Sequence, residues 1–185
     1  MSVKNYEDVL NFWYDDKYIP LHFEENDEFD ELVRREFLET WEAGKEGLLV
    51  DWRKNIKGRV AEIIVLDQFS IRAYTQDKMA IALAQEVVMM EEYSDLSDLE
   101  KKNVLLPFMH SESTKLHDWA YKYYLELDDE KTLFFEDKHR AILDRFGRYP
   151  YQNEDLGRKS TPEEIAFLEE KDGDFFDMKE FQGND

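Results

Sequence analysis

The stretch EKTLFFEDKHRAILDRFGRYP, residues 130–150, indicates a long helix with a defined end. Phe135, Ile142 and Phe146 lie seven and four positions apart, which is the spacing of side chains on one helix face. Gly147 suits the left-handed residue that follows many helices, and the proline three positions later prevents continuation. The stretch therefore predicts a helix that ends at Phe146.

The same apolar spacing recurs along most of the chain, whereas glycine and proline, at seven and four residues, are scarce. No alternation of apolar and polar residues is long enough to indicate a strand. We therefore expect an all-α protein built from antiparallel helix pairs, with about eight helices. The expected helices cover approximately residues 6–15, 26–44, 60–71, 79–93, 97–107, 111–127, 130–146 and 161–171.

Several of these helices have recognisable N-terminal signals. Ser97 with Glu100, and Thr161 with Glu164, have the spacing of a capping box, in which two side chains bond two backbone N–H groups reciprocally. Pro107 is expected to cut or kink its helix because proline lacks an N–H donor. The candidate N-caps are Asn26 or Asp27, Thr75 or Asp77, Ser97, Ser111 and Thr161.

Length and composition favour one domain. A chain of 185 residues can bury roughly 70% of its unfolded surface without disulfides or metals. We expect a single all-α domain over residues 1–170. Residues 171–185 are acidic and contain glycine, so we expect a flexible tail there, with Phe175 and Phe176 as the side chains that could dock.

The overall charge argues against two classes of partner. The chain has 44 acidic and 24 basic residues, and its net charge of −20 repels nucleic-acid phosphates and anionic lipid surfaces. It has no cysteine, no apolar stretch near the roughly 18 residues of a membrane span, and no signal-peptide pattern at its start. We therefore expect a cytoplasmic protein that binds neither nucleic acid nor membranes.

Two ionisable residues occupy apolar helix faces. Asp67 lies four positions after Ile63 and four before Ile71, and His139 lies on the face of Ile142. A buried charge is costly unless it is paired, so Asp67 is either part of a structural ion pair or a catalytic carboxylate. His139 is more commonly a hydrogen-bonded core histidine. If Asp67 and His139 meet, they would form an acid–base pair.

A third polar cluster, His110, Ser111 and Glu112, follows Pro107. Ser111 is a candidate N-cap, and Glu112 would then lie favourably in the first turn. His110 and His117 are seven positions apart, but a cap at Ser111 breaks the continuous helix that a shared metal ion would require. We expect no metal site and no cofactor.

Residues 138–159 form a locally basic segment, which we call the basic island, with six basic residues against three acidic ones. The planar fork of arginine suits carboxylate and phosphate groups, so a small anionic ligand would bind here most favourably. Equally, Arg145 and Arg148 could interact with the helix C-terminus and neutralise buried acids such as Asp67. The six basic residues are Lys138, Arg140, Arg145, Arg148, Arg158 and Lys159.

These motifs resemble a bacterial family classified as domain of unknown function 924, whose fold is similar to right-handed tetratricopeptide-like α-α superhelices. The resemblance covers most of the chain and implies the fold, but it implies no settled activity. It rests on ordered matches at Phe12-Trp13-Tyr14, Phe29-Asp30, Phe37, Leu66-Asp67-Gln68-Phe69, Leu106-Pro107-Phe108, His110-Ser111-Glu112, His139, Arg145-Phe146-Gly147-Arg148-Tyr149-Pro150, Asn153, Leu156-Gly157-Arg158 and Ser160-Thr161-Pro162-Glu163-Glu164.

Two positions depart from the family pattern. The family usually has Pro-Arg-Asn where this chain has Ser70, Ile71 and Arg72. It usually has His-Arg where this chain has Tyr151 and Gln152. If those side chains perform the family's chemistry, this member has a changed ligand or has kept only the scaffold.

Two functions are compatible with these patterns. The first is a polar site that binds a small anionic molecule, with or without catalysis. The alternative is a helical module that binds a protein or peptide in a groove lined by residues such as Tyr121 and Tyr124, with the polar motifs serving structure. The candidate catalytic residues are Asp67, His110, Glu112 and His139, and the candidate ligand-binding residues are Gln68, Arg72, Ser111, Arg145, Arg148, Asn153 and Arg158.

Overall fold

The computed structural model is all-helical, without strands, over the residues that it describes. These residues are 2–22, 26–73, 78–171, 175, 176 and 181, with side chains described for all of them except 71–73. They contain nine α-helices, two of which are separated by a single residue, so the expectation of about eight helices is confirmed. The helices are α1 (Tyr6–Trp13), α2 (Asp27–Lys45), α3 (Ile56–Leu66), α4 (Gln68–Ala73), α5 (Lys78–Val88), α6 (Asp98–Met109), α7 (Thr114–Leu127), α8 (Glu130–Phe146) and α9 (Pro162–Lys171).

The chain forms two compact units, Met1–Pro107 and Phe108–Asp185. The division falls inside α6, which continues to Met109, so Pro107 does not cut this helix. The single domain, the flexible tail and the tetratricopeptide-like superhelix stay predictions, because the compactness of each unit tests none of them. Within the described ranges, no helix has both the length and the apolar character needed to span a bilayer.

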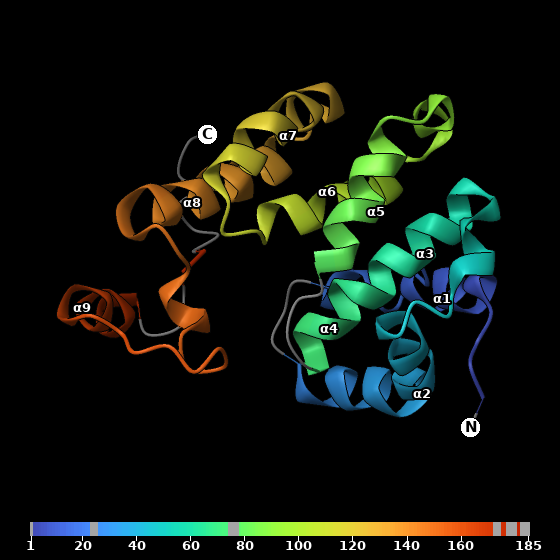
Figure 1. The fold of residues 1–185 in the computed structure, drawn as a ribbon, viewed down its shortest axis with the longest axis horizontal. Coiled ribbons are helices and arrows are strands. Elements are labelled where there is room, and N and C mark those ends of the chain that lie inside the picture. Colours follow the sequence, from blue (N-terminus) through green and yellow to red (C-terminus); the bar gives the residue numbers. More distant parts are fainter. Residues whose placement is uncertain (1, 23–25, 74–77, 172–174, 177–180, 182–185) are drawn as a thin grey trace. The chain divides into compact units, whose positions relative to one another are not determined.

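Helix α3 forms the core of the first unit. Every residue of α3 from Val60 to Leu66 is buried, and the helix packs against α1, α2, α4 and α5 (Figure 1). A helix that is apolar on nearly all sides must be covered on all sides. Glu62 is the charged residue in this span, and Arg53 bonds its two carboxylate oxygens at 2.8 and 2.7 Å.

Asp67 interrupts the single helix that was expected to run through Ile71. Its backbone, with φ −105° and ψ −67°, departs from regular helix geometry, and α4 begins at the next residue. The Asp67 side chain is only 2% exposed, and its Oδ2 accepts a 2.7 Å hydrogen bond from Gln68 Nε2. The expectation that Asp67 lies on a buried helix face is confirmed, whereas its role as an ion-pair partner or a catalytic carboxylate stays a prediction.

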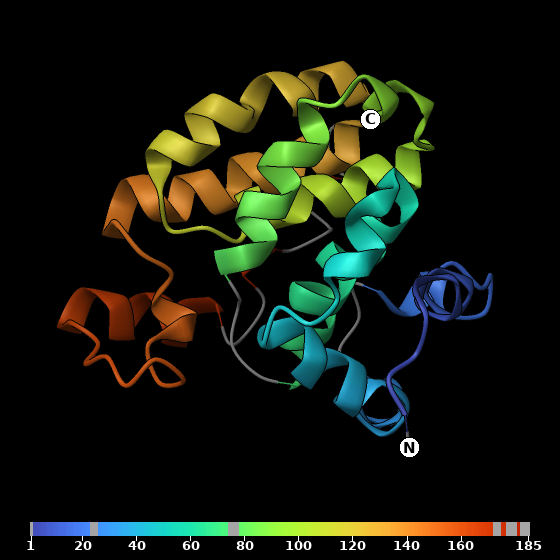
Figure 2. The same ribbon diagram turned by 45° about the vertical axis from the view of Figure 1, so that its right-hand side comes forward.

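In the second unit, α7 and α8 lie side by side as an antiparallel pair, which both ribbon views show (Figures 1 and 2). Asp128, with a positive φ of 54°, ends α7, and the side chain of Asp129 caps α8 by accepting from Thr132 N. Helix α8 ends at Phe146, followed by Gly147 with φ +69°, as the sequence predicted. The apolar cluster that joins α8 to α9 contains Ile142, Leu143, Tyr149 and Phe167.

Both predicted capping boxes are confirmed. The Glu100 carboxylate accepts from Ser97 N at 3.0 Å, and Ser97 Oγ accepts from Glu100 N at 3.4 Å. Glu164 and Thr161 exchange the equivalent bonds at 2.7 and 3.2 Å. Asn26 caps α2 by accepting from the N–H group three residues later. These ends are local in sequence, which is why the sequence predicts them.

Two helix ends differ from expectation. Helix α5 ends at Val88 rather than near Tyr93, because residues 91–95 form a separate 3-10 turn. The N-cap of α7 is Ser113 rather than Ser111, since Ser113 Oγ accepts from Leu116 N at 3.4 Å. The other expected caps, Thr75 and Asp77, lie outside the described residues.

Candidate functional site

His139 is a buried histidine whose two ring nitrogens have different surroundings. Its Nδ1 donates a 2.8 Å hydrogen bond to the carbonyl oxygen of Phe135, one turn earlier in α8. In the neutral ring this leaves a lone pair on Nε2, which has no hydrogen-bond partner among the described residues. Burial, with a smaller effect of His110, lowers the pKa of His139 to about 3. At neutral pH the ring is therefore an uncharged hydrogen-bond acceptor and a poor general base.

Three aromatic rings lie close to His139. The ring centroids of His110 and Tyr149 lie 5.9 and 5.6 Å from that of His139. Phe176 stacks on the imidazole, with 4.1 Å between ring centroids and 14° between ring planes. We call the four residues His110, His139, Tyr149 and Phe176 the histidine site. Two of the predicted site residues thus lie together, since His110 and His139 are both members.

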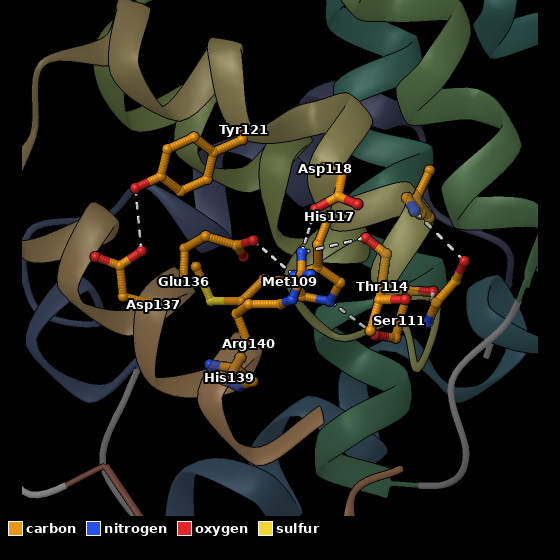
Figure 3. Close-up of polar contacts among 12 residues, drawn as sticks. Met109, Ser111, Thr114, His117, Asp118, Tyr121, Glu136, Asp137, His139 and Arg140 are labelled. Carbon is orange, nitrogen blue, oxygen red and sulfur yellow. Dashed lines mark hydrogen bonds and ion pairs between the residues drawn. The ribbon is translucent and has the colours of Figure 1, made fainter. Parts of the chain in front are cut away.

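A second histidine, His117, is paired with Glu136 between α7 and α8 (Figure 3). His117 Nδ1 lies 2.6 Å from Glu136 Oε1, and its Nε2 lies 2.8 Å from the carbonyl oxygen of Ser111. Both side chains of the pair are 1% exposed. Both ring nitrogens of His117 therefore face oxygen acceptors. The pair anchors the segment that precedes α7 onto α8.

Glu112 is held by Arg158 and by the backbone of Tyr149. Arg158 Nη1 and Nη2 donate to the two carboxylate oxygens at 2.6 and 2.8 Å, and Tyr149 N donates to Oε1 at 2.7 Å. Burial acts to raise the pKa of Glu112, but the bonds from Arg158 and Tyr149 outweigh it and lower the pKa on balance. Glu112 is therefore an ionised partner of Arg158, and its catalytic role stays a prediction.

Glu164 makes a comparable pair with Arg148. Arg148 Nε and Nη2 donate to the two carboxylate oxygens at 2.6 and 2.8 Å, and this ion pair is the main reason that the pKa of Glu164 is lowered to about 2. Asn153 Nδ2 donates to Ser160 Oγ at 3.0 Å and more weakly to Glu164 at 3.4 Å. We call Glu112, Arg148, Arg158 and Glu164 the arginine–glutamate network, whose formal charges sum to zero.

All four arginines of the basic island are paired with carboxylates. Besides the two pairs of the network, Arg145 bonds Glu163 at 3.1 Å and Arg140 bonds Asp144 at 2.8 Å. Figure 3 also shows Arg140 bonded to Asp118 on α7. The four arginines of the island therefore neutralise carboxylates, and the island presents less positive charge than its composition suggests.

The other predicted site residues lie outside the histidine site and the arginine–glutamate network. Ser111 contributes its carbonyl oxygen to His117, and its side chain accepts from the N–H group of Ser113. Asp67 and Gln68 belong to the first unit, so the pairing of Asp67 with His139 in the second stays a prediction. Arg72 lies in α4, and its side chain is outside the described part of the structure.

Sequence reasoning missed Glu136 and Tyr149 as polar members of the second unit. Glu136 precedes His139 by three positions and Leu143 by seven, so the helical spacing places it on the buried face of α8. That spacing was a usable signal. Tyr149 was quoted only within a family motif, and nothing local predicts that its hydroxyl donates to the carbonyl oxygen of Met109 at 2.6 Å.

Fold and site together define an all-helical protein with buried pairs of opposite charge, a class that by itself fixes no reaction. The chain belongs to the family described as bacterial protein of unknown function (DUF924), whose profile matches residues 9–172. It is also similar to a solved structure, the protein of unknown function ATU0120 from Agrobacterium tumefaciens. The two chains are 28% identical with a TM-score of 0.80, over 89% of this chain and 97% of that one. No curated protein matches the chain.

The Glu164–Arg148 pair predicts a specific dependence of stability on pH. The pKa of Glu164 is lowered in the folded state, so its contribution is complete above about pH 4.5 and is lost as the pH falls toward 2. We expect Glu164→Gln to lower the free energy of unfolding by about 2 kcal/mol at pH 7, because charged hydrogen bonds are lost. Urea unfolding of the variant and the wild type should show this difference shrinking between pH 5 and pH 2.

The neighbouring Glu163→Gln is the matched control for this measurement. The Glu163 side chain is 64% exposed in its contact with Arg145, so its loss should change stability by less than about 1 kcal/mol. A difference between wild type and Glu164→Gln that stays constant from pH 7 to pH 2 would contradict the role assigned to the ionised carboxylate.

Proposed function

We propose that the protein binds a small anionic molecule at the histidine site, with Nε2 of His139 accepting a hydrogen bond from the ligand. The observation that carries this proposal is the buried, neutral imidazole of His139, whose acceptor nitrogen has no partner among the described residues. A neutral imidazole nitrogen without a protein partner can accept a hydrogen bond from a donor group of a ligand that reaches it.

Arg148 is the arginine best suited to the anionic group of this ligand. Its Nε and Nη2 are committed to Glu164, and Nη2 also donates to the carbonyl oxygen of Lys159. Its Nη1 takes part in none of these bonds, and the Arg148 side chain is 28% exposed. Arg158, in contrast, uses both terminal nitrogens on Glu112. Arg148 also directly precedes Tyr149, a member of the histidine site.

The chemistry of the site restricts the ligand further. The arginine–glutamate network has no net charge, so a simple anion gains little from long-range attraction. A carboxylate or phosphate that also carries a hydroxyl or amino group can bond Arg148 and donate to His139. The low pKa of His139 favours binding over acid–base catalysis, because the ring neither carries nor readily accepts a proton at neutral pH.

Thermal unfolding in the presence of carboxylated and phosphorylated metabolites tests the proposal. A ligand at about 100 times its dissociation constant stabilises the folded chain by about 2.7 kcal/mol, which raises the melting temperature measurably. We expect His139→Phe to abolish this shift, because phenylalanine keeps the ring but removes the acceptor nitrogen. Arg148→Gln should abolish it as well.

Lys159→Gln is the matched control for Arg148→Gln, since it removes one positive charge from the exposed part of the same basic island. The control should leave the ligand shift unchanged, and circular dichroism should show that each variant is folded. If Lys159→Gln abolishes the shift as fully as Arg148→Gln does, the ligand responds only to net charge, and the assigned site is wrong.

A second function, a helical module that binds a protein or peptide, is favoured by the pairing of every arginine in the basic island with a carboxylate. On this interpretation the polar motifs serve structure. The groove expected for such a module needs revision, because Tyr124 is 1% exposed and Tyr121 donates to Asp137 at 3.2 Å (Figure 3). The absence of any stabilising metabolite, together with an intact fold, would favour this function over the first.

A further inference from the structure

Three of the chain's four histidines lie in one cluster of the second unit. The ring centroid of His139, on α8, lies 5.9 Å from that of His110, which directly follows α6, and 5.6 Å from that of Tyr149. The Tyr149 hydroxyl oxygen lies 3.4 Å from Nε2 of His117, on α7. His117 and His139 are 1% and 6% exposed, and Tyr149 is completely buried. The cluster therefore lies where α7, α8 and their neighbouring segments pack together.

The titratable groups that face His139 from other elements are uncharged or able to become positive. His110 and His117 present imidazole rings, and Tyr149 presents a phenol that donates its proton to the carbonyl oxygen of Met109 at 2.6 Å. An imidazole gains a positive charge when it binds a proton, and like charges at this distance repel in a buried site. These neighbours therefore favour the neutral form of His139.

The buried carboxylate that precedes His139 on α8 is already engaged. Glu136 lies three positions earlier, and its Oε1 lies 2.6 Å from Nδ1 of His117. Among the described residues, no carboxylate lies within ion-pair distance of His139 itself. A positive charge on His139 would therefore have no acidic partner of its own.

A proton on His139 would have to bind to Nε2, because Nδ1 already donates to the carbonyl oxygen of Phe135. The new N–H group would find no acceptor among the described residues, which makes the charged ring costly to keep buried. Burial, with smaller effects of His110 and His117, accordingly lowers the pKa of His139 to about 3, against 6.5 in water. Its folded-state pKa is depressed, so the stability due to the neutral ring is complete above about pH 6.5 and is lost as the pH falls toward 3.

We propose that the three clustered histidines form an acid-sensitive switch, in which a proton taken up by His139 opens the packing of α7 and α8 while the first unit stays folded. Buried histidine clusters can bias a folded element in this way, since the open form binds the proton more tightly. The first unit has its own core around α3 and contains none of the three histidines. The switch goes beyond the proposed function and requires no ligand.

Hydrogen exchange of the full chain, measured by mass spectrometry at pH 7 and pH 5 and corrected for the intrinsic exchange rates, tests the switch. The opening constant of the α7 and α8 amides should rise about 25-fold between pH 7 and pH 5, because each pH unit below 6.5 favours the protonated open form about tenfold. The amides of α3 should keep the same opening constant. Glu164 adds little in this range, because its contribution is lost only below about pH 4.5.

His139→Phe is the decisive variant, since it keeps an aromatic ring but cannot bind a proton. The opening constant of α7 and α8 in this variant should be the same at pH 7 and pH 5. Only the ratio between the two pH values is compared, so a change in overall stability does not affect the test. His139→Gln is a second variant without a titrating ring, in case phenylalanine prevents folding. Glu164→Gln, which keeps all three histidines, is the control that should retain the wild-type ratio.

Three results would overturn the switch. The first is a wild-type opening constant for α7 and α8 that does not change between pH 7 and pH 5. The second is a wild-type ratio that persists in His139→Phe or His139→Gln, which would assign the response to another group. The third is an equal rise in α3, which would show that acid unfolds the whole chain at once.

Discussion

Trp13→Ala should lower the free energy of unfolding by about 4 kcal/mol, since truncating a buried tryptophan both removes apolar contact and leaves a cavity. Trp13 is completely buried in the first unit, and its ring stacks on His22 with 3.7 Å between centroids. Its Nε1 donates to Asn103 Oδ1 at 3.0 Å, and its ring also meets Phe69 at 5.6 Å. The variant therefore loses packing on several sides and leaves a buried amide oxygen without its donor.

Urea unfolding followed by circular dichroism measures this loss, with Trp119→Ala as the matched control. Trp119 is 37% exposed, so its truncation should cost far less, about 1 kcal/mol. Trp13→Phe should lie between the two, because it keeps most of the ring but not the bond to Asn103. A cost for Trp13→Ala no larger than that for Trp119→Ala would show that the ring is not part of the core.

His117→Phe should be the most damaging change in the second unit, with an expected loss of about 3–5 kcal/mol. Phenylalanine fills the space of the imidazole but leaves the buried carboxylate of Glu136 without its 2.6 Å partner. It also removes the donor to the carbonyl oxygen of Ser111. The other carboxylate oxygen, Glu136 Oε2, is already buried without a hydrogen-bond partner among the described residues, so little else is available to compensate.

The double variant His117→Phe with Glu136→Met separates the two causes of this loss. Replacing both members of a buried polar pair with apolar groups of similar size removes the uncompensated carboxylate, and it should recover at least half of the lost stability. Unfolding measurements on the two single variants and the double variant give the coupling energy. Additive losses, with no recovery in the double variant, would contradict a paired role for His117 and Glu136.

These expectations also change how the polar motifs are understood. Glu112 was a candidate for proton transfer, but its carboxylate is occupied by two Arg158 nitrogens and the Tyr149 backbone. His139, in contrast, keeps an acceptor nitrogen and is the better candidate for ligand contact. The motifs of the second unit therefore contain both structural pairs and one chemically available group, which the spacing of residues alone does not distinguish.

Local signals in the sequence determined the helices and several of their ends. Gly147 and the capping boxes at Ser97 and Thr161 act within one turn of the backbone, so residue identity is enough to predict them. Ser111 shows the limit of such signals. Ser113 competes for the same cap two positions later, and the segment before α7 is held by the bond from His117 to the Ser111 carbonyl oxygen.

Only the tertiary structure decided which polar residues are partners. Arg158 lies 46 positions from Glu112, and His117 lies 19 positions from Glu136. Helical periodicity indicates that a side chain faces the interior, but it gives no distance to side chains on other elements. The sequence therefore determined an all-helical chain with ionisable groups on its apolar faces. The packing of α7, α8 and the segments around them decided which carboxylates the arginines neutralise and that His139 Nδ1 bonds the Phe135 carbonyl oxygen, because pairing depends on distances that only the folded chain sets.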